Sequence, residues 1–388
     1  MRGLRPSWRL AGAFASLIAG GAVCVFAAAG PHAAVAGTHP ESTRATKVRL
    51  LTGFADAFDG PPQFVILGSS RAMRAQPAFV TQRLHLRGFN AAIGSGTAAD
   101  ALAYVRLVKR LYPGQPFGVL WLLDVETLRL SGLSDYVRSV PDLLACLPEG
   151  VRRSCVAAGS DPADADLGYG LPSASAQAVS KASTRSAYPD LHSRWARDGY
   201  LVWSSYDYDR LRGVTTGGRL GIQLAQYRGI YPSRVRDGMT GWSKWCVREV
   251  LREAAAMGVT PVVVLTPYHP TLRRFIVARG WGRIHAAVLA FLRDQQAETP
   301  LRVLDMTSIS SFGGWPNGFY DGVHPRPAMT RRLLAAVLRR AGTALEPPLS
   351  EPPPTPTPTP AQTPPPNATP AAIGTPSPGA AASSSQPR

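Results

Sequence analysis

The sequence predicts an α/β fold, in which a mostly parallel five-stranded sheet is covered by helices on both faces. Short, almost wholly apolar runs alternate along the chain with longer segments whose apolar residues recur at helical spacing. Strands that are apolar throughout are typical of a parallel sheet, because both of its faces are buried. We therefore expect a three-layer sandwich that binds its ligands at the carboxyl ends of the strands.

Five short apolar segments are the predicted strands of this sheet: residues 64–67, 88–93, 117–123, 259–265 and 301–304. Four longer segments have helical periodicity: residues 97–112, 242–257, 284–296 and 327–341. The first of these helices has a capping signal, since Thr97 precedes Asp100 by three residues. The second is followed by Gly258, the residue type that most often ends a helix.

Residues 130–240 interrupt this alternation with many glycines, serines and aromatic residues and with little periodicity. We interpret the segment as an insertion into the α/β domain that forms a cap or lid. Its aromatic residues have two explanations, local packing, which we favour, or a stacking platform for a sugar. These residues are Trp195, Tyr200, Trp203, Tyr206 and Tyr208.

Residues 1–36 have the pattern of an export signal, because three arginines precede a run without charge at residues 10–30. The run is long enough to span a membrane, so we favour an uncleaved anchor. Cleavage after Ala36, with release of the domain, is the alternative, and a buried helix of the domain is a third. We therefore expect an exported protein, either anchored to the cytoplasmic membrane with its domain outside or secreted into the cell envelope. No other run is comparable, which excludes a protein with several membrane spans.

Residues 347–388 hold 15 of the 36 prolines and only two charged residues, Glu351 and Arg388. This composition does not supply enough apolar surface for folding, so we predict a disordered tail. Its Thr-Pro steps favour a stiff, extended spacer, and a tail without a specific role is the alternative. The predicted α/β domain is then residues 37–346.

The net charge of +17 is mostly carried by this domain, since about +14 remains without the two ends. Only four of the 42 basic residues are lysines, and the arginines are dispersed along the chain. No nucleic-acid-binding motif accompanies the charge, so nucleic acid is not an expected partner. A basic surface also suits an anionic envelope polymer or a lipid headgroup. Protein partners are not predicted.

The four cysteines do not have the spacing of a metal site, and neither a metal nor another cofactor is expected. Cys146 and Cys155 are separated by eight residues and are candidates for a small disulfide in an exported protein. Cys246 lies in a predicted helix and is expected to be a buried thiol.

Polar clusters follow the predicted strands or precede the last helix: residues 68–71, 94–96, 124, 266–269 and 321–324. Each cluster alone is typical of a turn or a helix cap. Together they supply a hydroxyl, an imidazole and a carboxylate, the three groups of a serine nucleophile with its base and orienting acid.

Two of these clusters resemble the conserved blocks of the SGNH/GDSL hydrolase superfamily. Gly68-Ser69-Ser70-Arg71 is similar to the opening block, and the run Phe-Tyr-Asp-Gly-Val-His-Pro at 319–325 to the closing one. The residues of these two runs are similar to those of the family's envelope-associated branch, which includes proteins similar to those of alginate O-acetylation and teichoic acid D-alanylation. The resemblance implies a flavodoxin-like three-layer sandwich, the SGNH hydrolase fold, around this site.

The resemblance also implies roles for individual residues. Ser70 would be the nucleophile, His324 its general base and Asp321 the carboxylate that orients the imidazole. The backbone N–H groups of Ser70 and Gly96 would form the oxyanion hole, with Gly94 in place of Gly96 if the loop is shifted.

A third conserved block of the family usually contains an Asn that helps to form the oxyanion hole. The corresponding strand end of this sequence reads Trp121-Leu122-Leu123-Asp124 and has no Asn. An ionised carboxylate donates no hydrogen bond to an oxyanion. Either the two backbone amides suffice, or Tyr268 substitutes, or hydrolysis is inefficient. The predicted substrate-binding residues are Arg71, Asp124, Tyr268 and His269. An internal salt bridge is the alternative for Arg71, and a competing base or a structural residue are the alternatives for His269.

The sequence thus predicts a serine-dependent esterase or O-acyltransferase that acts on an acylated envelope polysaccharide or lipid. A catalytically idle, anchored module of the same fold that binds envelope glycan is the second hypothesis. A structural envelope protein that works through its tail is the third, and it leaves the paired motifs unexplained.

Overall fold

The structure, a computed structural model, describes residues 43–129, 140–149, 193–204, 206–207, 213, 215–231 and 238–347. The predicted export segment, Cys155 with its proposed disulfide, and nearly all of the proline-rich tail lie outside these residues.

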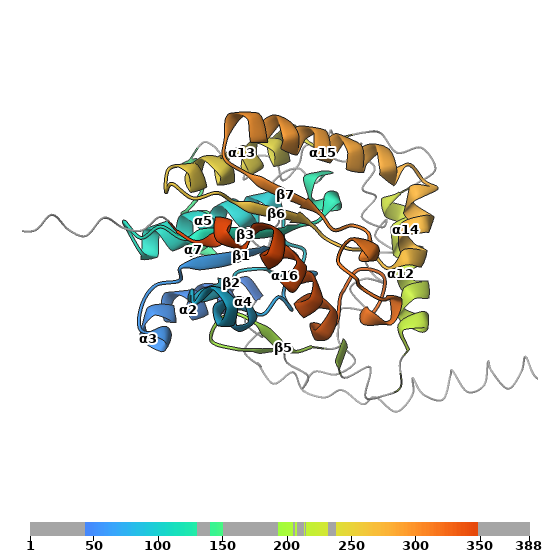
Figure 1. Ribbon diagram of the computed structural model, residues 1–388, viewed down its shortest axis with the longest axis horizontal. Coiled ribbons are helices and arrows are strands. Elements are labelled where there is room, and N and C mark those ends of the chain that lie inside the picture. The colour runs from blue at the N-terminus through green and yellow to red at the C-terminus, as the bar shows by residue number, and fades with distance from the viewer. Residues whose placement is uncertain are drawn as a thin grey trace, which may run out of the picture. The chain divides into compact units, whose positions relative to one another are not determined.

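A five-stranded sheet with the order β2-β1-β3-β6-β7 forms the centre of the fold, and all of its pairs are parallel (Figure 1). Its strands are β1 (Phe64–Gly68), β2 (Gly88–Asn90), β3 (Gly118–Leu123), β6 (Val262–Leu265) and β7 (Arg302–Asp305). The five predicted strands are therefore present and in the order of a flavodoxin-like sheet. The strand order reverses between β1 and β3, so the carboxyl ends of these two strands face the crevice where such folds bind ligands.

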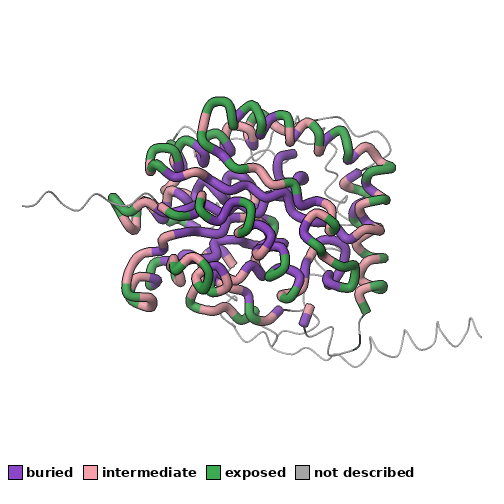
Figure 2. Tube along the Cα trace, in the orientation of Figure 1, coloured by how far each residue is buried: buried purple, intermediate pink, exposed green. Residues whose placement is uncertain are grey.

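Helices cover both faces of the sheet, which confirms the three-layer α/β sandwich. Successive residues of β1 point to opposite faces, so Val65 and Leu67 join one core while Phe64 and Ile66 join the other. The first core is completed by α2 (Thr43–Thr52), α3 (Phe54–Phe58), α5 (Ala98–Leu111), α13 (Gly241–Ala255) and α15 (Trp281–Glu298). The second is completed by α4 (Pro77–Leu84) and α16 (Pro327–Ala341). Figure 2 shows the buried sheet between layers of partly exposed helices.

The four predicted helices correspond to α5, α13, α15 and α16, with ends that differ by up to three residues. The capping signal of α5 is confirmed: Thr97 accepts the Asp100 backbone N–H at 3.3 Å, and Asp100 accepts the Thr97 N–H at 2.8 Å. β2 is shorter than predicted, although beyond its end the Ala91 and Ile93 N–H groups still donate to the Ile66 and Gly68 carbonyls of β1 at 2.8 and 3.2 Å.

The predicted insertion contains ordered elements in its described part. A two-stranded antiparallel sheet joins β4 (Arg194–Trp195) to β5 (Leu201–Trp203). Helix α12 (Thr216–Ile230) packs against α14 (Pro270–Val277), and neither helix was predicted from the sequence. The short helix α7 (Pro141–Leu144) packs on α5. Apart from short described stretches such as residues 196–200, 206–207 and 238–240, the rest of this segment lies outside the described residues.

Within the described ranges, no single helix is long and apolar enough to cross a membrane, although α14 and α15 pass as a pair bent by 94°.

Candidate active site

Ser70 lies in the turn that follows β1, and Gly68 allows that turn to form. Gly68 has a φ of 149°, and a Cβ at this position would lie 2.5 Å from the Leu122 carbonyl oxygen and 2.7 Å from the Ala72 Cβ. Only glycine fits there, because a side chain would collide with the backbone of β3. The close approach of β1 to β3 therefore sets where Ser70 leaves the sheet.

The Ser70 hydroxyl contacts His324 from the other end of the chain: the Ser70 Oγ lies 2.8 Å from the His324 Nε2. His324 lies in the loop before α16, where Phe319 and Pro325 form an antiparallel bridge. The imidazole is half-buried, with 17% of its side chain exposed, and Ser70 is also half-buried. Solvent therefore reaches the serine–histidine pair.

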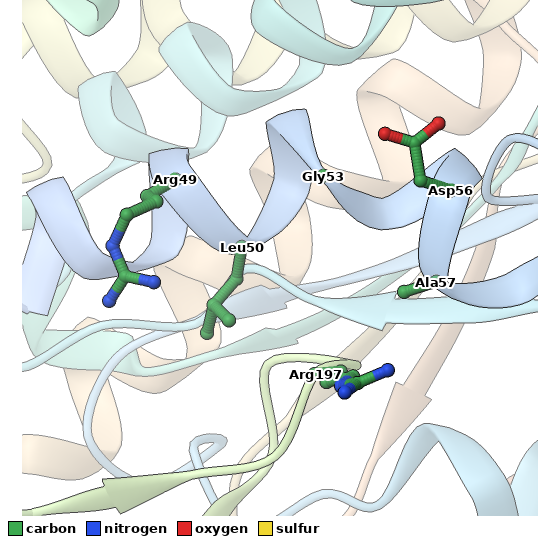
Figure 3. Close-up of a pocket in the computed structure, with 6 residues that line it drawn as sticks. All are labelled: Arg49, Leu50, Gly53, Asp56, Ala57 and Arg197. Atoms are coloured by element: carbon green, nitrogen blue, oxygen red, sulfur yellow. The ribbon is translucent and has the colours of Figure 1, made fainter. Parts of the chain in front are cut away.

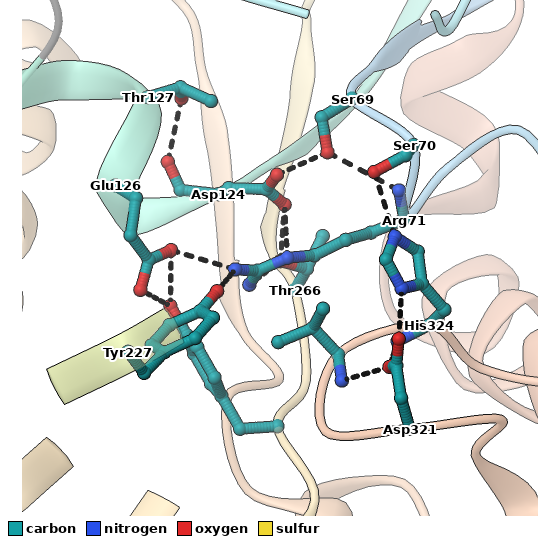
Figure 4. A network of polar contacts seen from close by, with 12 residues as sticks. Ser69, Ser70, Arg71, Asp124, Glu126, Thr127, Tyr227, Thr266, Asp321 and His324 are labelled. Atoms are coloured by element: carbon teal, nitrogen blue, oxygen red, sulfur yellow. Dashed lines mark hydrogen bonds and ion pairs between the residues drawn. The ribbon is translucent and has the colours of Figure 1, made fainter. Parts of the chain in front are cut away.

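Asp321 holds the far side of the imidazole, since its Oδ2 lies 2.7 Å from the His324 Nδ1 (Figure 4). Its Oδ1 accepts the backbone N–H groups of Val323 at 2.8 Å and His324 at 2.9 Å. Burial opposes ionisation of Asp321, but the charge and hydrogen bond of His324 and these N–H groups lower its pKa to about 2. The carboxylate is therefore ionised at neutral pH and accepts a hydrogen bond from the Nδ1–H group, which leaves the Nε2 lone pair facing Ser70.

The three predicted catalytic residues are thus in mutual contact, although 254 residues separate Ser70 from His324. A hydroxyl, an imidazole and a carboxylate in this order are able to generate a serine alkoxide equivalent and to return the proton to a leaving group.

Tyr206 is a further member of the site that sequence reasoning did not identify. Its hydroxyl lies 3.0 Å from the His324 Nδ1, and its ring is 5.0 Å from the imidazole centroid. Burial raises the pKa of Tyr206, and the charge of Asp321 raises it further, so the phenol stays protonated. The sequence contained only an aromatic cluster in a segment without periodicity, and nothing in it linked Tyr206 to a histidine 118 residues away.

A buried ionic network underlies the nucleophile turn, with Arg71 at its centre (Figure 4). The guanidinium pairs with Glu126 at 2.9 Å and with Asp124 at 3.5 Å. It also donates to Thr266 at 3.2 Å and hydrogen-bonds the Tyr227 hydroxyl. Burial disfavours the charged guanidinium, but the negative charges of Asp124 and Glu126 raise its pKa well above the usual value. Arg71 therefore remains a cation inside the protein.

The structure places Arg71, Asp124 and Tyr268 among these internal contacts, with exposed fractions of 6%, 5% and 0%. The Tyr268 hydroxyl donates to both oxygens of Glu126 at 2.8 Å, and its ring lies 4.7 Å from the Arg71 guanidinium carbon. For Arg71 the internal salt bridge, one of the two alternatives, is present. A substrate contact through any of these three residues stays a prediction, and their geometry supports a role in fixing the turn that carries Ser70.

Asp124, which stands where the family pattern has Asn, acts as an acceptor. Ser69 donates its hydroxyl hydrogen to Asp124, and Thr266 donates to the other carboxylate oxygen at 2.6 Å. With Arg71 also paired to it, Asp124 joins the ends of β1, β3 and β6. It supplies no donor for an oxyanion.

His269 caps a helix, since its Nδ1 accepts the Thr271 backbone N–H at 3.2 Å at the start of α14. Its own backbone N–H donates to the Gly322 carbonyl at 2.8 Å, next to Asp321. Burial and then the charge of Arg274 lower the pKa of His269. The Ser70 hydroxyl is paired with His324 instead, so the arrangement favours a structural role for His269 over that of a competing base.

Gly96 lies against the nucleophile turn, because a Cβ at this position would be 2.5 Å from the Gly68 carbonyl oxygen. Gly94 has open space at the corresponding point. The Gly96 N–H donates to the Ile93 carbonyl at 3.2 Å, whereas the Ser70 N–H has no acceptor among the described residues. The geometry therefore favours Gly96 over Gly94 as the glycine beside Ser70, with the Ser70 amide as the more available oxyanion donor.

A separate surface groove of about 320 Å³ lies between α2, α3 and the β4–β5 turn (Figure 3). It is lined by Arg49, Leu50, Gly53, Asp56, Ala57 and Arg197. None of these residues belongs to the triad or to the ionic network. In the described part of the chain, no group of three or more His, Cys, Asp or Glu side chains is arranged to hold a metal ion.

No protein-family model matches the chain, and no curated protein matches it either.

Proposed function

We propose that the protein is a serine-dependent esterase or O-acyltransferase of the SGNH/GDSL type, with Ser70, His324 and Asp321 as its catalytic triad. The observation that carries the proposal is the chain of two short contacts, 2.8 Å from Ser70 Oγ to His324 Nε2 and 2.7 Å from His324 Nδ1 to Asp321. The triad also lies at the carboxyl edge of the parallel sheet, where α/β folds of this kind bind their ligands.

In the proposed reaction, the Ser70 oxygen attacks an ester carbonyl while its proton passes to the His324 Nε2. The ionised Asp321 stabilises the imidazolium that results. Collapse of the tetrahedral intermediate breaks the ester C–O bond, and the leaving alkoxide takes the proton from Nε2. Ser70 then carries the acyl group as an ester.

Water or a sugar hydroxyl completes the reaction. His324 removes the proton of this acceptor as its oxygen attacks the acyl-serine, and the same proton then returns to the Ser70 oxygen as it leaves. With water the products are an acid and an alcohol, and with a sugar the acyl group is transferred. Both outcomes balance without a metal or a redox partner.

The oxyanion would be stabilised by the backbone N–H of Ser70, together with that of Gly96 if it releases Ile93. Loss of one oxyanion donor typically costs about 2.7–4 kcal/mol of transition-state stabilisation. A site with Asp in place of the usual Asn is therefore expected to be slow with either acceptor, water or a glycan hydroxyl.

The proposed substrate is an acylated envelope polysaccharide or lipid, and the export pattern of residues 1–36 supports this location. The charge of about +14 on the domain favours an anionic polymer.

Turnover of p-nitrophenyl acetate by the full chain tests the proposal, with Ser70→Ala as the decisive variant and Ser308→Ala, at another half-buried serine, as the matched control. We expect hydrolysis that disappears in Ser70→Ala and persists in Ser308→Ala. Equal turnover in Ser70→Ala would contradict the proposal. To separate transferase from esterase, an acetylated donor is incubated with and without an acceptor glycan, and acetylated glycan is compared with free acetate.

A catalytically idle glycan-binding module is the second candidate, and the acceptor role of Asp124 favours it. Such a module would bind acylated glycan with equal affinity in the wild type and in Ser70→Ala, and neither form would release acetate.

A further inference from the structure

Asp207 joins the two parts of the site that carry the nucleophile and the base. Its carboxylate forms an ion pair with Arg74, four residues after Ser70, and accepts the Tyr320 hydroxyl at 2.8 Å, one residue before Asp321. The Ser204 backbone N–H also donates to it at 3.0 Å. A single buried carboxylate therefore connects the turn after β1 to the loop before α16.

The Asp207 carboxylate is held in its charged form. Burial raises its pKa, but the hydrogen bonds of Tyr320 and Arg74 and the charge of Arg74 outweigh burial and lower the pKa below the usual value. Because an ionised acceptor strengthens both hydrogen bonds, the connection is present at neutral pH.

Tyr206, the preceding residue, holds the imidazole itself. Its hydroxyl lies 3.0 Å from the His324 Nδ1, the same nitrogen that contacts the Asp321 carboxylate at 2.7 Å. Its ring stacks on Tyr320 with centroids 5.4 Å apart, and the Arg219 guanidinium carbon lies 4.5 Å from the ring centroid. A 180° flip of the His324 ring would place Cδ2 where Nδ1 now meets Asp321 and Tyr206, and both contacts would be lost.

We propose that Tyr206 and Asp207, here called the clamp, are positioning residues of the catalytic triad. The clamp keeps His324 in its Nδ1–H tautomer and keeps Nε2 facing Ser70. This inference rests on the proposed role of Ser70, His324 and Asp321, and it assigns to the inserted segment a part in assembling the catalytic site. Displacement of a reacting group by about 1 Å costs up to about 100-fold in rate, so the clamp is needed for turnover even though it does not touch substrate.

Two conservative variants of the full chain test the clamp. Tyr206→Phe keeps the ring and removes the hydroxyl, and Asp207→Asn keeps the shape and removes the charge. Tyr112→Phe is the control for the first, because the Tyr112 hydroxyl donates to the Leu51 carbonyl at 2.7 Å away from the site. Glu253→Gln is the control for the second, because Glu253 pairs with Arg106 and Lys109 between α5 and α13.

The first measurement is the NMR spectrum of chain labelled with ¹⁵N in its histidine rings, with His324→Gln used to assign the His324 signals. We expect a protonated Nδ1 and an unprotonated Nε2 in the wild type and in both controls. In Tyr206→Phe and Asp207→Asn we expect the His324 signals to move toward a mixture of tautomers. This readout does not require that the protein turn over any ester.

The second measurement is the kinetics of p-nitrophenyl acetate hydrolysis. We expect kcat to fall about 10- to 100-fold in the clamp variants, with KM within about twofold of the wild type, because the clamp acts on the base and not on ester binding. Thermal unfolding checks that each variant is folded. If Asp207→Asn does not fold, Tyr206→Phe decides the test, because it retains the packing.

A wild-type His324 spectrum with unchanged kcat in Tyr206→Phe overturns the clamp. Altered His324 signals in the clamp variants support the clamp even if the protein neither hydrolyses an ester nor transfers its acyl group to a glycan, and that lack of both activities overturns the proposed function. Ester turnover that depends on Ser70 but not on Tyr206 would support the proposed function and overturn the clamp.

Discussion

Ser69 donates its hydroxyl hydrogen to Asp124, so the residue before the candidate nucleophile is joined to the carboxyl end of β3. Thr266 donates to the same carboxylate from the end of β6 at 2.6 Å. A carboxylate suits this position because all of its neighbours are donors, whereas an amide would turn an NH₂ group toward one of them.

Asp124→Asn is therefore expected to weaken the site, although it restores the residue type of the family pattern. An amide there leaves a buried donor facing another donor and removes a charge partner of Arg71. We expect a loss of about 1–3 kcal/mol in the free energy of unfolding and lower ester turnover. Urea unfolding and p-nitrophenyl acetate assays measure both, with Asp142→Asn at an exposed ion pair as the control. Faster turnover in Asp124→Asn would show that the position serves as an incomplete oxyanion hole.

Arg71→Met is expected to cost far more stability than loss of a surface arginine. It leaves the buried carboxylates of Asp124 and Glu126 without their cation, and removal of one partner of a buried ion pair costs about 3–5 kcal/mol. Arg110→Met breaks a pair whose side chains are 44% and 64% exposed, and we expect at most about 1 kcal/mol there. Equal unfolding midpoints in urea for the two variants would mean that the network does not hold the turn.

Gly96→Ala is expected to reduce activity, and Gly94→Ala is expected to leave it unchanged. The added methyl group of Gly96→Ala meets the Gly68 carbonyl oxygen at 2.5 Å and pushes the turn that carries Ser70, whereas Gly94 has open space. A displacement of this kind predicts a fall in kcat/KM of about 100-fold for Gly96→Ala. The reverse ranking of the two variants would make Gly94 the glycine of the site.

Asp321→Asn is expected to lower stability by an amount that depends on pH. The pKa of Asp321 is about 2 in the folded protein and about 3.9 in an unfolded chain, so its ionised form stabilises the fold by about 2–3 kcal/mol at neutral pH. Because the folded pKa is the lower one, this contribution is complete above pH 5 and disappears as the pH falls toward 2. Urea unfolding at several pH values should give curves for wild type and Asp321→Asn that converge at low pH. A difference in unfolding free energy between the two proteins that stays the same at every pH would contradict the low pKa of Asp321.

The sheet was predictable because its central strands β1, β3 and β6 are almost uninterrupted apolar runs, whereas the edge strands β2 and β7 include Asn90, Arg302 and Asp305. The two motifs were predictable because one follows a strand and the other precedes a helix. Helix α2 was not found, since its buried face includes Arg44 and Lys47. Arg44 pairs with Asp100 at 2.8 Å, and Lys47 donates to the Asn90 carbonyl at 2.5 Å. Hydrophobic periodicity does not detect a face that is buried through ion pairs and hydrogen bonds.

The contacts of the site across the chain were less predictable than its motifs. Arg71 and Asp124 follow different strands, and only the parallel pairing of β1 with β3 brings them together in a network. Tyr206 and Asp207 come from a segment without periodicity, so their contacts with His324 and Arg74 depend on tertiary structure alone.

Labelling by a fluorophosphonate probe tests the central claim most directly, since the probe forms a covalent bond only with a serine that is activated by a base. Peptide mass spectrometry of the labelled full chain should find the adduct on Ser70, no adduct in Ser70→Ala, and labelling slower by at least about 100-fold in His324→Ala. No adduct in the folded wild type, or equal labelling in His324→Ala, would contradict a catalytic triad at this site.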